Sequence, residues 1–178
     1  LERATKLDRQ VDDLIAAGRY REALPLASES LEIRREILGE DHADYALSLN
    51  NLAVLYWLMG DYARAEPLYC QSVEIHRKVL GEEHPDFAVS LNNLAAMYES
   101  MGDYARAEPL HRQALEIQRR VLGEDHPHYA TSLNNLAHLY ESMGDYARAV
   151  PLCRQALEIR KRVLGEDHPH FATSLDNL

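Results

Sequence analysis

The sequence is poor in the residue types that mark several functional classes. Its 178 residues include only two cysteines, Cys70 and Cys153, too few for a disulfide framework or a zinc site. We expect both to be buried as small hydrophobic side chains. Basic residues are outnumbered, with 19 Lys and Arg against 29 Asp and Glu, and a net charge of −10 argues against nucleic acid as a partner. Apolar runs are short and no signal peptide opens the chain, which predicts a soluble, cytoplasmic protein without a membrane partner.

Glycine is also scarce, yet its spacing organises the whole chain. All eight glycines lie 21 residues apart, from Gly18 to Gly165, and the seven prolines form two series with a period of 42. Glycine just past a helix can take the left-handed conformation that ends it, and proline suits a first helical position. Each interval therefore predicts one helix of about 17 residues and a tight turn. Two intervals make a 42-residue helical hairpin, which is the repeating unit.

The apolar pattern predicts that both helices of each hairpin are amphipathic. In the first helix the apolar positions follow helical spacing and return in later repeats, as at Leu49, Leu52, Ala53 and Tyr56. In the second helix we expect a buried stripe from Ala65 to Val73 that continues at Val79 and Leu80. Charges on the outer side are expected to form i, i+4 pairs at Glu74–Lys78, Glu116–Arg120 and Glu158–Arg162. The chain is therefore predicted to be all-α.

These residues resemble a known repeat. The segments Leu49-x2-Leu52-Ala53-x2-Tyr56, Gly60-Asp61-Tyr62 and Ala65-x3-Tyr69 are similar to the tetratricopeptide repeat, with Leu in place of the usual first Trp. The pattern GEDHP-x-x-A-x-SLNNLA-x-x-Y at 123–140 resembles the 42-residue repeats of kinesin light chains. It also resembles bacterial arrays that accompany caspase-like peptidase or nucleotide-binding ATPase domains. Two departures are visible, since basic residues replace the usual closing proline and the aromatic at Tyr69 becomes His111 and Cys153.

The resemblance implies an α-solenoid, a right-handed superhelix of stacked antiparallel hairpins. It would form a single array over 1–178. The expected parts are a degenerate N-terminal hairpin at 1–42, full repeats at 43–84, 85–126 and 127–168, and the start of a truncated repeat at 169–178.

One asparagine recurs per repeat at the same position of the first helix, at Asn51, Asn93, Asn135 and Asn177. Asparagine within a helix costs up to about 0.7 kcal/mol relative to Ala, so we expect something to offset the repeated cost. A carboxamide donates and accepts hydrogen bonds, and a ladder of them could hold the backbone of an extended peptide in a concave groove. The resemblance to kinesin light chains and to O-GlcNAc transferase arrays implies the same. Alternatively, each Asn bonds to the adjacent repeat and fixes stacking. The neighbouring Asn50, Asn92 and Asn134 could serve either purpose.

The predicted groove is apolar at one end and polar at the other. Its first full repeat presents Leu47, Val54, Trp57 and Leu58, whereas later repeats present Ala96 and His138. Trp57 is the single tryptophan, and it either anchors an apolar ligand side chain or packs on the first hairpin.

The charged residues near the ladder lead to two further expectations. Arg9 occupies the ladder position of the first hairpin, which is either an N-terminal cap or a place where Arg9 grips a ligand carboxylate. Glu99 and Glu141 flank the ladder, so the preference of kinesin light chains for acidic peptides is not carried over to this chain.

The nine histidines raise the question of a metal site. One recurs per repeat at the turn into the first helix, at His42, His84, His126 and His168, where a side chain can cap free N–H groups. We therefore expect no metal, no cofactor and no catalysis. The predicted function is a non-enzymatic protein-interaction scaffold for a protein or peptide ligand. The alternative is a spacer or regulatory arm of a larger signalling or protease protein that associates end to end, suggested by a repeat that stops partway at Leu178.

Overall fold

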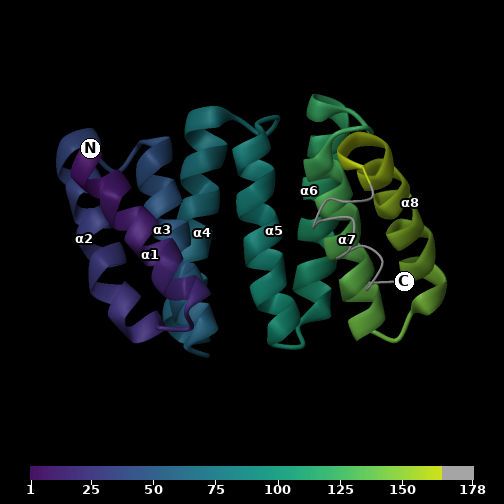
Figure 1. The fold of residues 1–178 in the computed structure, drawn as a ribbon, viewed down its shortest axis with the longest axis horizontal. Coiled ribbons are helices and arrows are strands. Elements are labelled where there is room, and N and C mark those ends of the chain that lie inside the picture. Colours follow the sequence, from purple (N-terminus) through teal and green to yellow (C-terminus); the bar gives the residue numbers. More distant parts are fainter. Residues whose placement is uncertain (166–178) are drawn as a thin grey trace. The chain divides into compact units, whose positions relative to one another are not determined.

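The computed structural model describes residues 1–165, and short turns join the helices in this part of the chain. The helices are α1 (Glu2–Ala16), α2 (Tyr20–Leu38), α3 (Ala43–Leu58), α4 (Tyr62–Leu80), α5 (Pro85–Ser100), α6 (Tyr104–Leu122), α7 (Pro127–Ser142) and α8 (Tyr146–Leu164). They follow one another as antiparallel hairpins, which confirms the predicted all-α fold (Figure 1). Within residues 1–165, none of the helices has both the length and the hydropathy needed to cross a bilayer.

The helices form two compact units, called unit 1 and unit 2 below. Unit 1 spans Leu1–Gly81 and contains α1 to α4, and unit 2 begins at Glu82 and contains α5 to α8. In unit 1 the hairpins α1/α2 and α3/α4 are joined by packing of α2 on α3. In unit 2 the hairpins α5/α6 and α7/α8 are joined by packing of α6 on α7, and α5 also touches α7. The single array over 1–178 stays a prediction.

Local sequence explains where the helices end. Gly60 follows α3 with a φ of +76°, in the left-handed region that favours glycine. This conformation lets the N–H of Asp61 donate to the carbonyl of Tyr56 at 2.8 Å, which satisfies a free acceptor at the end of α3. Gly81 ends α4 with a φ of +87°. The glycine spacing therefore marks real helix ends.

Side-chain caps explain where the helices begin. The Nδ1 atoms of His42, His84 and His126 each accept from the backbone N–H two residues on, at 3.1 to 3.2 Å. The predicted capping role of these histidines is confirmed, while His168 lies outside the described residues. The second helix of the later hairpins begins instead with a capping aspartate, as where Asp61 accepts from the N–H of Arg64 at 3.1 Å.

The core of unit 1 contains the predicted stripe and a buried polar contact. Leu49 and Ala53 are at most 1% exposed. The guanidinium of Arg34 is also buried, and it donates to Asp8 Oδ2 at 2.6 Å and to Ser48 Oγ at 2.5 Å. Because these residues lie on α2, α1 and α3, the contact ties the first hairpin to the second. A buried cation needs such partners, because an unpaired charge is costly away from water.

The core of unit 2 is built in the same way from repeated positions. Tyr129 and Leu133 of α7 pack with Ala156 and Ile159 of α8. Leu115 of α6 packs partly against the same cluster. The core thus joins the α5/α6 hairpin to the α7/α8 hairpin through α6, the second helix of the earlier hairpin.

Two expectations about burial are wrong. Cys70 is exposed, because it lies next to the buried Tyr69 on α4 and one residue turns the helix by about 100° away from the core. Val79 is 41% exposed, and Val121 and Val163 are exposed to nearly the same extent. The buried stripe of α4 ends at Ile75 and His76, so its last turn extends past the core.

The outer charges pair differently from the predicted i, i+4 pattern. Lys78 Nζ binds Asp41 at 2.7 Å and Arg120 binds Glu83 at 2.7 Å, while Arg162 binds Asp125. Each of these basic residues sits near the end of a second helix and reaches the turn before the first helix of its own hairpin. A long side chain at a helix end can reach that turn because the two helices are antiparallel. Arg120 keeps a longer contact of 3.6 Å with Glu116.

Candidate functional site

The ladder asparagines lie at equivalent positions of the first helices. Asn51 is on α3 in unit 1, and Asn93 and Asn135 are on α5 and α7 in unit 2. All three side chains are half-buried. Asn177 lies outside the described residues. Within unit 2 the two helices that carry the ladder are in contact, so Asn93 and Asn135 belong to neighbouring elements.

Unit 1 surrounds its ladder position with apolar side chains. Leu47 is 45% exposed and Leu58 is 37% exposed, although α3 also contributes side chains to the core. Val54 and Trp57 of the same helix are half-buried. The apolar character expected of this first full repeat therefore lies at the surface of α3.

Arg9 lies on the exposed side of α1. Together with Leu1, Glu2, Thr5 and Lys6 it lines a surface hollow of about 570 Å³. The preceding residue, Asp8, is the one that binds Arg34 and anchors α1 to its unit. Asp8 thus takes part in packing α1 on α2, whereas Arg9 lies at the surface of α1.

In unit 2 the corresponding surface is polar and links α5 to α7. His138 is exposed, and its Nδ1 lies 2.5 Å from Oε1 of Glu99. The Ser142 hydroxyl donates to the same oxygen at 2.8 Å. Ala96 lies half-buried on α5. Glu99 thus collects two donors from the neighbouring helix, although its own side chain is only 10% exposed.

The asparagines next to the ladder positions, Asn50, Asn92 and Asn134, are buried. The hydrogen bonds of Asn92 show a role in packing. Asn92 is 6% exposed, its Nδ2 donates to Ser132 Oγ at 2.7 Å, and its Oδ1 accepts from His111 Nδ1 at 2.8 Å. Ser132 in turn donates to Gln118 Oε1 at 2.9 Å. Asn92 therefore joins α5, α6 and α7. Sequence reasoning left its role undecided.

Buried residues of the second helices face the ladder helices and differ between repeats. Tyr69, His111 and Cys153 occupy equivalent positions, and each is at most 2% exposed. His111 Nε2 lies 3.8 Å from Glu99 Oε2, and Cys153 Sγ lies 3.7 Å from Glu141 Oε1. The signal in the sequence was the paired change, because Glu replaces Trp57 where His or Cys replaces Tyr69.

The pKa values of Glu99 and Cys153 are shifted by burial and by neighbouring groups. Burial alone would raise the pKa of Glu99, but His111, Ser142 and His138 together outweigh it and hold that pKa below its usual value of 4.5. Glu99 is therefore ionised at neutral pH. Burial, with the nearby charge of Glu141, raises the pKa of the Cys153 thiol to about 11. This thiol is not a nucleophile at neutral pH.

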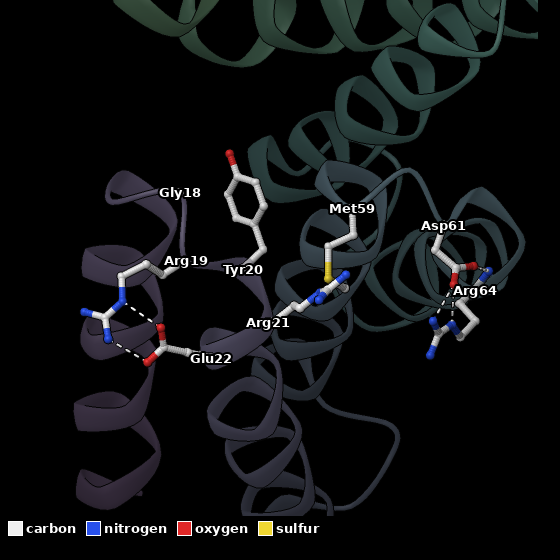
Figure 2. A pocket seen from close by; sticks show the side chains of 8 residues that line it. All are labelled: Gly18, Arg19, Tyr20, Arg21, Glu22, Met59, Asp61 and Arg64. Carbon is white, nitrogen blue, oxygen red and sulfur yellow. Dashed lines mark hydrogen bonds and ion pairs between the residues drawn. The ribbon is translucent and has the colours of Figure 1, made fainter.

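A further hollow in unit 1 was missed by the sequence reasoning. It has a volume of about 520 Å³ and lies where the turn before α2 approaches the turn before α4 (Figure 2). Arg19 pairs with Glu22 on one side and Asp61 pairs with Arg64 on the other. Arg21 and Met59 lie between these two pairs (Figure 2). The signal was Arg19, which stands where later repeats have a capping aspartate.

The repeated helix pairs and their motifs agree with a family comparison. The tetratricopeptide repeat profile matches residues 2–78, 71–119, 86–161 and 133–178. The chain therefore belongs to the tetratricopeptide repeat family. This is a family of scaffolds that are usually non-catalytic and that generally bind protein partners. No catalytic family is indicated for the chain.

Solved structures place it near kinesin-light-chain-like members. A Podosopora anserina protein designated a kinesin light chain, with nearly identical TPR-like repeats, is 29% identical with a TM-score of 0.80. The match covers 99% of this chain and 83% of that one. A substituted variant of the same protein matches with a TM-score of 0.81. BtubC (BKLC) from P. vanneervenii is 28% identical with a TM-score of 0.77, over 93% of this chain and 66% of that one. No curated protein sequence matches the chain.

Proposed function

We propose that the chain is a non-enzymatic scaffold that holds an extended segment of another protein against its first helices. The ladder face, as we call this surface, is defined in each unit by itself: by Asn51 on α3 in unit 1, and by Asn93 on α5 and Asn135 on α7 in unit 2. A cytoplasmic location, expected from the composition, stays a prediction. The family supports the general role, and the ladder face is the part that is new for this chain.

The observation that carries the proposal is the division of labour between adjacent asparagines. Asn92 is buried and bonded to Ser132 and His111, so it accounts for the packing between α5 and α7. Its neighbour Asn93 and the equivalent Asn135 remain half-buried. Packing therefore explains Asn92, whereas Asn93 and Asn135 keep part of their surface within reach of a ligand.

Carboxamides at this spacing suit an extended chain. Helices that pack side by side are about 8 to 10 Å apart, and an extended peptide rises about 3.3 Å per residue. One step of the ladder in unit 2 therefore corresponds to about three ligand residues. Because both the N–H and the C=O of a peptide are unpaired in an extended chain, an amide that donates and accepts can hold it without regard to side chains.

The test is a selection followed by a binding measurement. A displayed library of random peptides of about 12 residues, enough to span more than one step of the ladder, is selected on the full chain. A captured peptide is then titrated by fluorescence anisotropy against the wild type and against the Asn93→Ala, Asn135→Ala double variant. Loss of about 1 kcal/mol for each hydrogen bond predicts binding about 10-fold weaker or more in the double variant.

The matched control is Gln113→Ala, which removes a carboxamide from the exposed side of α6. It should leave the affinity unchanged. Light scattering at the working concentration checks that self-association does not account for the signal. If the double variant binds every captured peptide as tightly as the wild type, the ladder has no role in binding.

A further inference from the structure

We propose that the segment bound on unit 2 is basic and that it places a lysine or arginine side chain on the carboxylate of Glu99. This inference rests on the proposed function and names the class of its ligand. It follows from the distribution of charge over the helices and from the way in which Glu99 is held.

The charges of unit 2 are sorted between its two kinds of helix. All nine Lys and Arg residues of this unit lie on α6 and α8, and none lies on α5 or α7. The carboxylate side chains of α5 and α7 are Asp86, Glu99 and Glu141, and α7 also carries His128 and His138. Apart from these histidines, the ladder face of unit 2 is therefore built on helices whose charged side chains are all acidic. A ligand of opposite charge would be attracted to this face, and an acidic ligand would be repelled.

Arginines of α6 and α8 do reach the first helices, but none of them is among the groups that hold the pKa of Glu99 down. The guanidinium groups of Arg106 and Arg148 lie over the rings of Tyr98 and Tyr140, each at 4.0 Å from the ring centroid. Arg112 donates to the Tyr140 hydroxyl at 3.1 Å. Arg160 donates to Thr131 Oγ1 at 3.3 Å. Its guanidinium is shielded, because Arg160 is only 5% exposed. Thr131 precedes His138 by two turns, or about 10 Å along the helix. The cation of Arg160 therefore does not neutralise the carboxylate of Glu99.

Glu99 is held so that a donor from outside can replace one from within. Its Oε1 accepts from His138 and Ser142, which are both exposed residues of α7. The His138 side chain is 70% exposed, so its ring can turn into water and leave that oxygen to a ligand ammonium or guanidinium. A charge-assisted hydrogen bond to a largely buried carboxylate is stronger than one in open water.

The residue beneath Glu99 keeps the carboxylate in this position. His111 is 1% exposed, and Asn92 fixes its ring through Nδ1. Its Nε2 has no hydrogen-bond partner within residues 1–165 and faces Glu99 Oε2 at 3.8 Å. The His111 ring thus packs against Glu99 on the Oε2 side, while Oε1 faces the exposed residues His138 and Ser142. The lowered pKa of Glu99 agrees with a charge that is present at neutral pH.

The preference is specific to unit 2. In unit 1 the position of Glu99 is taken by Trp57, beside the exposed Leu47 and Leu58. The same binding mode would therefore meet an apolar surface there. A uniformly basic preference over the whole chain is not expected.

The experiment selects the same displayed peptide library on the wild type and on Glu99→Gln. The matched control is Glu116→Gln, which changes net charge equally on the exposed side of α6. Lys and Arg should be enriched over Asp and Glu in the peptides captured by the wild type and by the control. The enrichment should fall at one peptide position for Glu99→Gln.

Affinity then identifies the contact. The lysine tested is the one at the peptide position where Glu99→Gln loses the enrichment. Replacing it by norleucine in a captured peptide should weaken binding to the wild type about 10-fold, equivalent to about 1.4 kcal/mol. The same change should matter less than about 3-fold for Glu99→Gln, since the partner is already gone. His138→Lys, at an exposed position, gives a second test in case Glu99→Gln unfolds. Its ammonium should occupy Glu99 and weaken the basic peptide at least about 5-fold.

The outcomes separate this inference from the proposed function. The captured peptides could be neutral, apolar or acidic and still bind less tightly to the Asn93→Ala, Asn135→Ala variant. That result would overturn the inference of a basic ligand and would support the proposed role of the ladder. An equal effect of norleucine on the wild type and on Glu99→Gln would overturn it as well. If the library yields no peptide that depends on the ladder asparagines, the proposed function itself fails.

Discussion

Replacing Asn92 by alanine should destabilise the chain far more than replacing Asn135, although both are helical asparagines in unit 2. Asn92→Ala removes the bonds to Ser132 Oγ and His111 Nδ1, which are 2.7 and 2.8 Å long. His111 is 1% exposed, so its Nδ1–H would lose its partner in a place that water does not reach.

The magnitude follows from these two bonds. A buried donor without a partner costs about 1 to 3 kcal/mol, and the lost bond to Ser132 costs about 1 kcal/mol. Alanine regains up to about 0.7 kcal/mol of helix propensity. The free energy of unfolding should therefore fall by about 1 to 3 kcal/mol. For Asn135→Ala the half-buried amide loses little and the propensity gain remains, so we expect a change within about 0.5 kcal/mol.

The assay is urea unfolding followed by far-UV circular dichroism, with the slope of the transition compared between variants. A midpoint shift with an unchanged slope reports a change in stability. An Asn92→Ala variant as stable as the wild type, or an Asn135→Ala variant that loses as much as Asn92→Ala, would refute the division of labour between the two positions.

Three further predictions concern pH, a turn and the thiols. The pKa of Glu99 is held below 4.5 in the folded chain, so its stabilising contribution is present above that value and lost as the pH falls below it. The stability difference between the wild type and Glu99→Gln should therefore shrink in urea titrations carried from neutral pH to below 4.5. Gly60→Ala should cost about 1 to 2 kcal/mol because of its φ of +76°, and a thermal midpoint unchanged from the wild type would contradict this. A thiol reagent should modify the exposed Cys70 rapidly and the buried Cys153 slowly under native conditions, with Cys70→Ser losing the fast phase.

Much of the fold could be predicted because each helix end is encoded locally. A glycine such as Gly60 ends a helix through its own backbone, and a histidine such as His84 caps the helix that follows it. Neither effect requires knowledge of the rest of the molecule. The stripe around Leu49 was equally readable, since helical spacing alone decides which side chains share a face.

The remaining features depend on contacts between distant residues, which spacing does not reveal. Lys78 finds Asp41 rather than a neighbour on its own helix, because the antiparallel partner brings that turn within reach. Asn92 and Asn93 are identical in type and adjacent in sequence, yet only the position of His111 and Ser132 shows which one is used for this packing contact. The exposure of Cys70 likewise depends on which side of α4 meets α3.

The most direct measurement of the central claim is the side-chain amide NMR spectrum of the full chain during titration with a captured peptide. The proposed ladder predicts that the Nδ2–H2 resonances of Asn93 and Asn135 shift on binding. The Nδ2–H2 resonances of the buried Asn92 should keep their chemical shifts. Shifts confined to the second helices, or saturation of the peptide without movement of the Asn93 and Asn135 signals, would contradict binding on the ladder face.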